Sequence, residues 1–274
     1  MEAARPYLAA FNARFQLMLQ YRTAALAGFA TQLWWGGIRI MVFAAFYGAN
    51  AAAAPISLAD AVTYVWLGQA LLALLPWLAD PEIGQAVRTG GVGYDRLRPL
   101  DAYGYWYART LGWMVARVAP RAVLMLLAAA IVLPLVGLEA WAWRPPAGLA
   151  AALLFVPALA LMTALATAVV MLANIVVAMS LNERGVNSIL QPLVIVFSGS
   201  LLPLNFYPES LQPWLHLQPF AGLVDTPFRI YFGNLAGGAA LQGLALQAGW
   251  TLALVGLGRL AMERVMRHLE MQGG

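Results

Sequence analysis

Long apolar stretches alternate with short polar segments along the whole chain. A helix that crosses about 30 Å of hydrocarbon needs about 20 apolar residues, so a window of that length identifies candidate membrane spans. Six stretches qualify, at residues 24–46, 58–80, 111–137, 147–180, 188–204 and 240–262. The pattern therefore predicts an all-α polytopic membrane protein, with six transmembrane helices in a single domain that covers residues 1–274. The fourth stretch is too long for one straight crossing, so we expect it to extend past the membrane or to bend near Pro157.

The first 23 residues have a different pattern, in which charged and apolar side chains are interleaved. A signal peptide carries its positive charge first and then an unbroken apolar core, which this segment lacks. Apolar residues recur instead at helical spacing on one side, at Leu8, Phe11, Phe15 and Met18. We therefore predict an amphipathic interfacial helix over residues 1–23 that lies on the cytoplasmic surface of the membrane and leads into the first span.

The composition agrees with this picture and excludes several kinds of chemistry. Hydrophobic residues make up 62% of the chain and charged residues 10%, so lipid must surround much of it. The absence of cysteine excludes disulfides and thiolate metal sites, and His216 and His268 are far apart in sequence. All sixteen basic residues are arginine, whereas ATP hydrolysis at a P-loop needs a lysine. We predict that the chain itself binds no metal or cofactor and is not an enzyme.

Arginine is concentrated in every other polar segment, and this predicts the orientation because positive residues are retained in the cytoplasm. The N-terminal tail, the loop at 81–110 and the C-terminal tail are rich in arginine. The segments at 47–57, 139–146 and 205–239 hold only two arginines in total. We therefore predict that both termini, the 81–110 loop and the 182–187 turn are cytoplasmic, and that the other three segments face outward.

The predicted cytoplasmic loop contains local signals for a short helix. Asp80 suits an N-cap, Pro81 suits the first helical position, and the pair Gly90-Gly91 suits the end. We predict a short helix that lies under the membrane with Arg88 exposed, where it can bind a partner protein. The alternative is a solvated basic loop that contacts anionic lipid headgroups.

A second unusual segment follows the fifth span. It is apolar and aromatic, but it is punctuated by four prolines, Pro203, Pro208, Pro213 and Pro219. Proline interrupts a continuous helix, yet the segment is too apolar for a free loop. Non-helical backbone is tolerated at membrane depth only where protein covers it or where it lines a cavity. We therefore predict short re-entrant outer helices over residues 205–220, between the fifth and sixth spans.

Polar side chains inside the predicted spans are candidates for a substrate pathway, because a charge in hydrocarbon is costly and usually has a function. Arg39 is the clearest case. It could face a cavity and attract an anionic substrate, or it could extend to the outer interface and pair with Asp60. The uncharged candidates could line the pathway or hydrogen-bond a neighbouring helix; they are Gln69, Asn174, Gln191, Ser198 and Ser200.

Two of these segments resemble a known family. The run from Arg88 to Asp101, Arg-Thr-Gly-Gly-Val-Gly-Tyr-Asp-Arg-Leu-Arg-Pro-Leu-Asp, is similar to a loop signature of ABC-2-type export permeases, in a branch whose members have six spans. The segment from Ser198 to Phe220 resembles the family's small-residue turn, prolines and tryptophan before the last span. The loop departs from the signature at Gly93, where leucine is usual, and at Ala102, where proline is usual.

The resemblance implies roles for both segments. The family's coupling helix, which contacts an ATPase subunit, falls on Pro81 to Thr89, and its re-entrant outer helices fall on Asn205 to Leu217. The residues that would couple this chain to the ATPase are Pro81, Glu82, Ile83, Gln85, Arg88, Arg96, Arg98 and Asp101.

The same resemblance implies the membrane-spanning permease subunit of an ATP-binding cassette (ABC) exporter in the bacterial cytoplasmic (inner) membrane. The subunit would pair with a second permease, identical or related, and separate ATPase subunits that bind ATP and Mg²⁺ would drive it. The many aromatic residues favour export of a hydrophobic or amphipathic substrate, as in multidrug efflux, by alternating access. No nucleic-acid partner is expected.

The alternative function is a passive channel or a secondary transporter. Secondary transporters are often built from internal repeats with broken helices at matching positions, whereas only the second half of this chain has the proline segment. An intramembrane hydrolase is a third class, and it would need Ser198 or Ser200 beside His216 as a base. The prolines between them argue against a fixed scaffold for such a pair.

Overall fold

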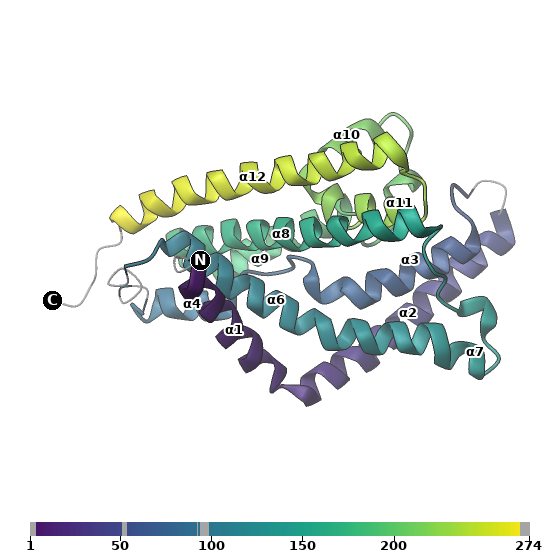
Figure 1. Cartoon of the computed structure of the whole chain (residues 1–274), viewed down its shortest axis with the longest axis horizontal. Coiled ribbons are helices and arrows are strands. Elements are labelled where there is room, and N and C mark those ends of the chain that lie inside the picture. The colour runs from purple at the N-terminus through teal and green to yellow at the C-terminus, as the bar shows by residue number, and fades with distance from the viewer. Residues whose placement is uncertain (1–3, 51–53, 92, 94–98, 269–274) are drawn as a thin grey trace.

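A computed structural model describes residues 4–50, 54–91, 93 and 99–268, and every regular element in these ranges is a helix. The longest helices are α2 (Arg22–Asn50), α6 (Ala102–Leu127), α8 (Leu149–Ser180) and α12 (Gly237–His268). Of these, α6, α8 and α12 run along the length of the molecule (Figure 1). A π-helical turn, Ala128–Val132, and α7 (Leu133–Leu135) continue α6.

Three helical segments of the described residues are long and apolar enough to cross a membrane, Ala102–Leu135, Leu149–Ser180 and Gly237–Arg267. This confirms the predicted all-α membrane protein, whereas the count of six spans stays a prediction. The fourth predicted stretch forms one helix, α8, which continues through Pro157.

Two helices end earlier than the stretches from which they were predicted. In the 58–80 stretch, α3 (Leu58–Leu71) and a 3₁₀ turn (Leu72–Leu74) end before Leu75, whose ψ of 141° is extended. Leu75 precedes Pro76, and proline disfavours the helical conformation in the residue before it. In the 188–204 stretch, α9 (Glu183–Phe197) ends just before Gly199, which has a φ of 88° that a helix cannot contain.

The N-terminal helix α1 (Arg5–Leu19) packs against α6. A methyl group on Gly112 of α6 would lie 2.5 Å from the Phe11 carbonyl oxygen, so only glycine permits this close approach. Phe11 and Met18 are half-buried as the predicted apolar side requires, while Leu8 is exposed. The buried residue of α1 is Arg14, which lies on the same side as Phe11 and Met18.

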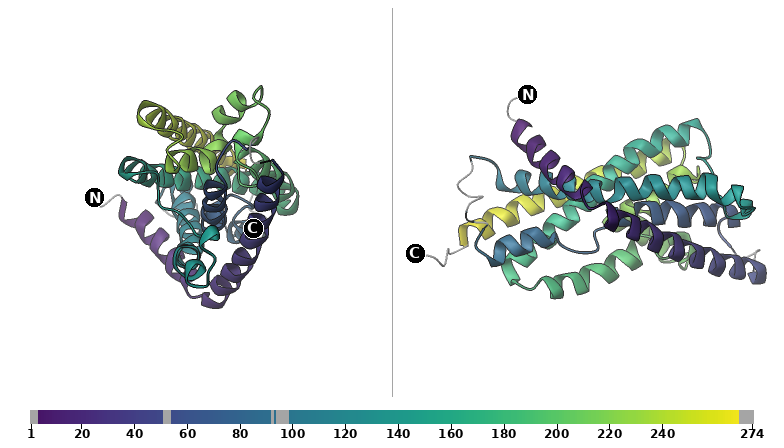
Figure 2. Two further views of the ribbon diagram at one scale, coloured as in Figure 1. Left: turned by 90° about the vertical axis from the view of Figure 1, so that its right-hand side faces the viewer. Right: turned by 90° about the horizontal axis from the view of Figure 1, so that it is seen from below.

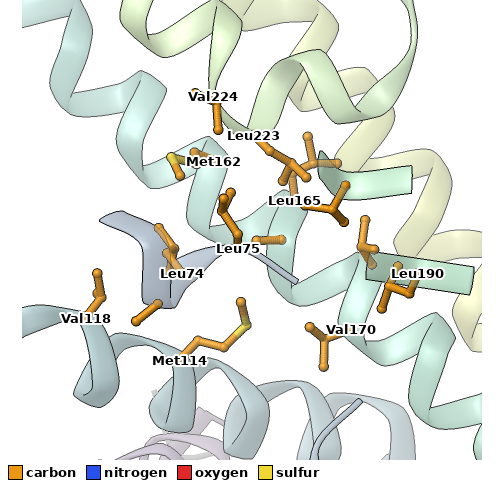
Figure 3. Packing of buried hydrophobic residues seen from close by; sticks show 14 of the residues in the cluster. Leu74, Leu75, Met114, Val118, Met162, Leu165, Val170, Leu190, Leu223 and Val224 are labelled. Atoms are coloured by element: carbon orange, nitrogen blue, oxygen red, sulfur yellow. The ribbon is translucent and has the colours of Figure 1, made fainter. Parts of the chain in front are cut away.

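The largest hydrophobic core surrounds the middle of α8. Met162, Leu165 and Val170 of this helix are almost fully buried. They pack with Leu74 and Leu75 after α3, with Met114 and Val118 of α6, with Leu190 of α9, and with Leu223 and Val224 (Figure 3). Contacts from α6, α9, α11 (Asp225–Tyr231) and α12 make α8 the central helix of the bundle (Figure 2).

The two ends of the bundle carry different segments. The short helix α4 (Pro81–Arg88), the start of α9 and the end of α12 lie at one end, and α7, α10 (Gln212–Leu217) and α11 lie at the other (Figure 1). The segments that were predicted to be cytoplasmic therefore gather at the α4 end. Which end faces the cytoplasm stays a prediction.

The proline-rich segment forms short helical pieces, as its prolines suggest. A 3₁₀ turn (Leu204–Phe206) follows Pro203, α10 has Pro213 in its first turn, and a second 3₁₀ turn (Pro219–Leu223) begins at a proline. Whether these pieces re-enter the membrane stays a prediction.

Candidate functional site

The helix α4 forms from the local signals that its sequence contains. The Asp80 carboxylate accepts a hydrogen bond from the Glu82 backbone N–H at 3.0 Å, and Pro81 occupies the first helical position. The helix ends at Arg88, and Gly90 follows with a φ of 75°. The capped helix predicted here is therefore confirmed, with Thr89 as its C-cap. Its assignment as a coupling helix is a separate matter and stays a proposal.

A cluster of four charged side chains, of which Arg14 and Asp80 are buried, fixes the start of α4 to α1 and α6. Arg14 Nη2 lies 3.3 Å from Asp80 Oδ1, and Arg14 also donates to Glu82 Oε1. Arg109 of α6 donates to the other Glu82 oxygen at 2.6 Å. The side chains of Arg14 and Asp80 are only 8% and 1% exposed. Buried ions are tolerated when each has a partner in good geometry, so this cluster holds three helices in one arrangement.

Two asparagines hold the chain just before α4. Asn174 of α8 accepts the Asp80 backbone N–H at 2.7 Å, and Asn187 of α9 accepts the Ala79 backbone N–H at 2.9 Å. Backbone that is buried outside a helix needs such partners. Asn174 therefore makes a hydrogen bond to a neighbouring segment, and its role in a substrate pathway stays a prediction.

The side of α4 that faces away from the bundle is exposed, so a partner could bind it. Gln85 and Arg88 are exposed, whereas Ile83 is 1% exposed and packs with Tyr103 and Trp106. Among the other residues expected to couple to an ATPase, Asp101 caps α6 by accepting the Gly104 N–H at 2.8 Å. Arg96 and Arg98 lie outside the described residues.

An open cleft connects α4 with the turn between α8 and α9. Arg88 Nη1 donates to Glu183 Oε2 at 2.9 Å across one side of this cleft. The cleft has a volume of about 760 Å³ and polar walls. Its lining residues are Arg88, Leu181, Asn182, Glu183, Arg184, Asn187, Ser188 and Gln191. Gln191, a pathway candidate, is therefore placed beside the α4 end rather than in the middle of the bundle.

Arg39 lies far from this cleft and holds the turn after α9. Its Nη2 donates to the carbonyl oxygens of Ser200 at 2.8 Å and Leu201 at 2.6 Å. Asp60, the partner considered from the sequence, is instead bonded to the Ser57 hydroxyl at 2.7 Å. Two candidates that are 161 residues apart in the chain, Arg39 and Ser200, are thus brought together.

The same turn involves the two candidate serines. Ser198 and Ser200 are buried, and the Ser198 hydroxyl accepts the Ser200 N–H at 3.1 Å. Tyr64 of α3 donates to the Gly199 carbonyl at 2.8 Å. Gln69, on the same helix as Tyr64, is 3% exposed, and its carbonyl oxygen has no hydrogen-bond partner among the described residues.

His216 binds an acid and not a serine. Its Nδ1 lies 3.0 Å from Asp225 Oδ2, and Arg229 lies 3.6 Å from the same oxygen. Asp225 is 2% exposed, and Arg229 supplies a positive charge to this buried carboxylate. Among the described residues, no hydrogen bond joins His216 to the hydroxyl of Ser198 or Ser200. The described residues also contain no group of three or more His, Asp or Glu that could hold a metal ion.

Sequence reasoning missed Arg14, Asn187 and the Asp225 cluster. A signal for Arg14 was present, because it follows Phe11 by three positions and precedes Met18 by four, which places it on the buried side of α1. No comparable signal identifies Asn187 or Asp225, because their partners are distant in the chain or lie in irregular segments.

Comparison with protein-family models matches residues 33–273 to the family described as ABC-2 family transporter protein. The match begins within α2, so α1 and its Arg14 precede it. A search of curated proteins finds no match.

Proposed function

The chain belongs to the ABC-2 family of transporter proteins, and from this premise we propose that it is the permease subunit of an ATP-driven exporter. Members of this family are multi-pass membrane components of transport and do not carry out the ATP chemistry. In the proposal, this subunit pairs with a second permease, identical or related, in the bacterial inner membrane with both termini in the cytoplasm. Separate ATPase subunits bind ATP and Mg²⁺ and drive export of a hydrophobic or amphipathic substrate.

The attachment of α4 supports this function best. The helix is bonded through Glu82 to α1 and α6, and its N-cap is bonded to α8. Its Gln85 and Arg88 side chains are exposed. A partner that displaces α4 would therefore displace several long helices together, which is what a coupling element has to do.

The sequence explains why the energy has to come from another subunit. The chain has no lysine, so it has no P-loop of its own. Alternating access requires two states that differ in substrate affinity, and ATP binding to a separate subunit can shift the balance between them.

The substrate pathway in this proposal involves Arg39, Gln69, Ser198 and Ser200, which lie at the α9 turn or on α2 and α3. Arg39 carries a positive charge, and within the described residues its hydrogen bonds go to two backbone carbonyl oxygens and to no carboxylate. A cation of this kind favours a substrate with an acidic or strongly polar group. Asn174 is left out of the pathway, because it serves as a positioning residue for α4.

The test is co-expression with a candidate ABC ATPase subunit from the same organism, followed by purification of the complex and reconstitution into lipid vesicles. Replacing residues 81–89 with a glycine-serine linker should leave ATP hydrolysis but abolish export of a fluorescent amphipathic dye. Because the linker also removes Glu82, a milder variant is needed. Gln85→Arg changes an exposed side chain of α4, and Ser210→Arg is its control at the opposite end.

We expect Gln85→Arg to weaken ATPase binding or coupling while the thermal stability of the permease is unchanged. Ser210→Arg should behave as the unmodified protein. Normal dye export by both the linker variant and Gln85→Arg would reject α4 as the coupling element.

A further inference from the structure

Two arginines in the apolar part of α6 lack an acidic partner. Arg117 and Arg121 lie one helical turn apart on the same face, within the segment Ala102–Leu135 that is long and apolar enough to cross a membrane. Like charges at this spacing repel one another. A charge at this depth is costly unless something compensates it, so the contacts of these two side chains need an explanation.

The contacts that these two half-buried cations make are weak. The Arg117 guanidinium lies over the Trp113 ring, 4.4 Å from its centroid. Arg121 Nη2 donates to the Ala24 carbonyl at 3.2 Å, and its buried Nε has no hydrogen-bond partner among the described residues. Asp80 attracts Arg117 at longer range, but that carboxylate is already bonded to Arg14 and to the Glu82 N–H.

Several other arginines of the bundle have an acidic partner. Five of them pair with a carboxylate of the described residues at 3.6 Å or less; they are Arg14, Arg88, Arg109, Arg229 and Arg259. The described part of the chain offers no carboxylate at such a distance to Arg117 or Arg121. The missing anion must therefore come from outside these residues.

The position of the two side chains indicates where that anion would come from. Arg121 lies against α2 at Gly28, where a methyl group would be 2.5 Å from Arg121 Cζ. This is two turns beyond the elbow that joins α1 to α2, and the elbow residues Gln20, Tyr21 and Arg22 are exposed. Arginine side chains of a helix lean toward its N-terminus, which for α6 is the α4 end of the bundle. Both arginine side chains are half-buried, and the elbow residues near Arg121 are exposed.

We propose that Arg117 and Arg121 bind the phosphate of an anionic phospholipid from the leaflet on the α4 side of the membrane. Paired guanidinium groups match phosphate oxygens well. Tyr21 at the elbow is exposed, and tyrosine is one of the aromatic residues that are enriched at the headgroup level.

The test uses the full chain, purified in detergent, and native mass spectrometry with two lipids of identical acyl chains. We expect phosphatidylglycerol to bind at least about tenfold more tightly than phosphatidylcholine, because the choline ammonium group of the latter offsets its phosphate charge, whereas phosphatidylglycerol keeps a net negative charge for the two guanidinium groups. The double variant Arg117→Gln/Arg121→Gln should lose this preference. Arg144→Gln, an exposed arginine near the other end of α6, is the control and should keep it.

Two further measurements keep the proposal falsifiable. If the double variant does not fold, Arg117→Lys/Arg121→Lys retains both charges and should keep part of the preference. In the unmodified protein, phosphatidylglycerol should raise the melting temperature more than phosphatidylcholine does. Equal binding of both lipids, an unchanged preference in the double glutamine variant, or complete displacement by millimolar inorganic phosphate would overturn the lipid site.

Discussion

Arg14 and Asp80 are 66 positions apart in the chain, yet Arg14 Nη2 lies 3.3 Å from Asp80 Oδ1 and both side chains are buried. The first belongs to α1, and the second caps α4. The contact therefore joins the N-terminal helix to the element that we propose as the docking site for the ATPase. Its removal should affect both stability and coupling.

Replacing Arg14 with glutamine should lower the free energy of unfolding by about 3–5 kcal/mol, because it leaves Asp80 as a buried charge without its main partner. Arg5→Gln, at the exposed start of the same helix, is the matched control. Thermal unfolding in detergent measures both. Equal stability of the two variants would show that the buried pair contributes nothing.

Replacing Asn174 with alanine should destabilise the protein by about 1–3 kcal/mol, because the Asp80 backbone N–H loses its acceptor. Dye export should fall in parallel, as α4 is held less firmly. Gln242→Ala, at an exposed position of α12, should change neither quantity. A loss of export with full thermal stability would instead return Asn174 to the substrate pathway.

Replacing Gly199 with alanine should destabilise the turn after α9 by more than about 1 kcal/mol. The φ of 88° disfavours a side chain, and the new methyl group would lie 2.9 Å from the Tyr64 hydroxyl oxygen. Gly238→Ala is the control, because a methyl group there meets no atom within 4 Å. The measurement is the melting temperature of each variant. An equal melting temperature for Gly199→Ala and Gly238→Ala would mean that the turn after α9 can rearrange to accept a side chain.

Replacing Arg39 with alanine should change export of the amphipathic dye more than it changes stability, if the cation serves the substrate pathway. Arg39→Lys keeps the charge and should retain more export than Arg39→Ala. The assays are dye export from vesicles and thermal unfolding. Normal export combined with a lower melting temperature would assign Arg39 a purely structural role in holding the Ser200 and Leu201 carbonyls.

Local signals in the sequence predicted the helix α4, but they did not predict which residues it contacts. Asp80, Pro81 and Gly90 predicted the start and the end of α4, because capping depends on neighbours in the chain. The pairing of Arg14 with Asp80 depends on how α1 packs on α6, and hydropathy carries no information on that packing.

The sequence analysis also did not predict where helices end inside apolar stretches. Hydropathy continues unbroken from α3 into the residues before α4, so the predicted span ran to residue 80. The helix itself ends at Leu74, and the side chains of Leu75 and Ala79 are buried in extended or irregular backbone. The pattern predicted only that this stretch is apolar, whereas its conformation depends on Pro76 and on the two asparagines that bind the backbone.

This interruption before α4 determines which way a mechanical signal could travel. An unbroken helix from Leu58 to Arg88 would act as a rod, so that pushing one tip moves the other. The extended link between Leu74 and Pro81 instead acts as a hinge. Its backbone N–H groups at Ala79 and Asp80 are hydrogen-bonded to Asn187 of α9 and Asn174 of α8. A force applied at α4 would therefore enter the bundle through α8 and through α1 and α6, to which α4 is bonded, and not along α3.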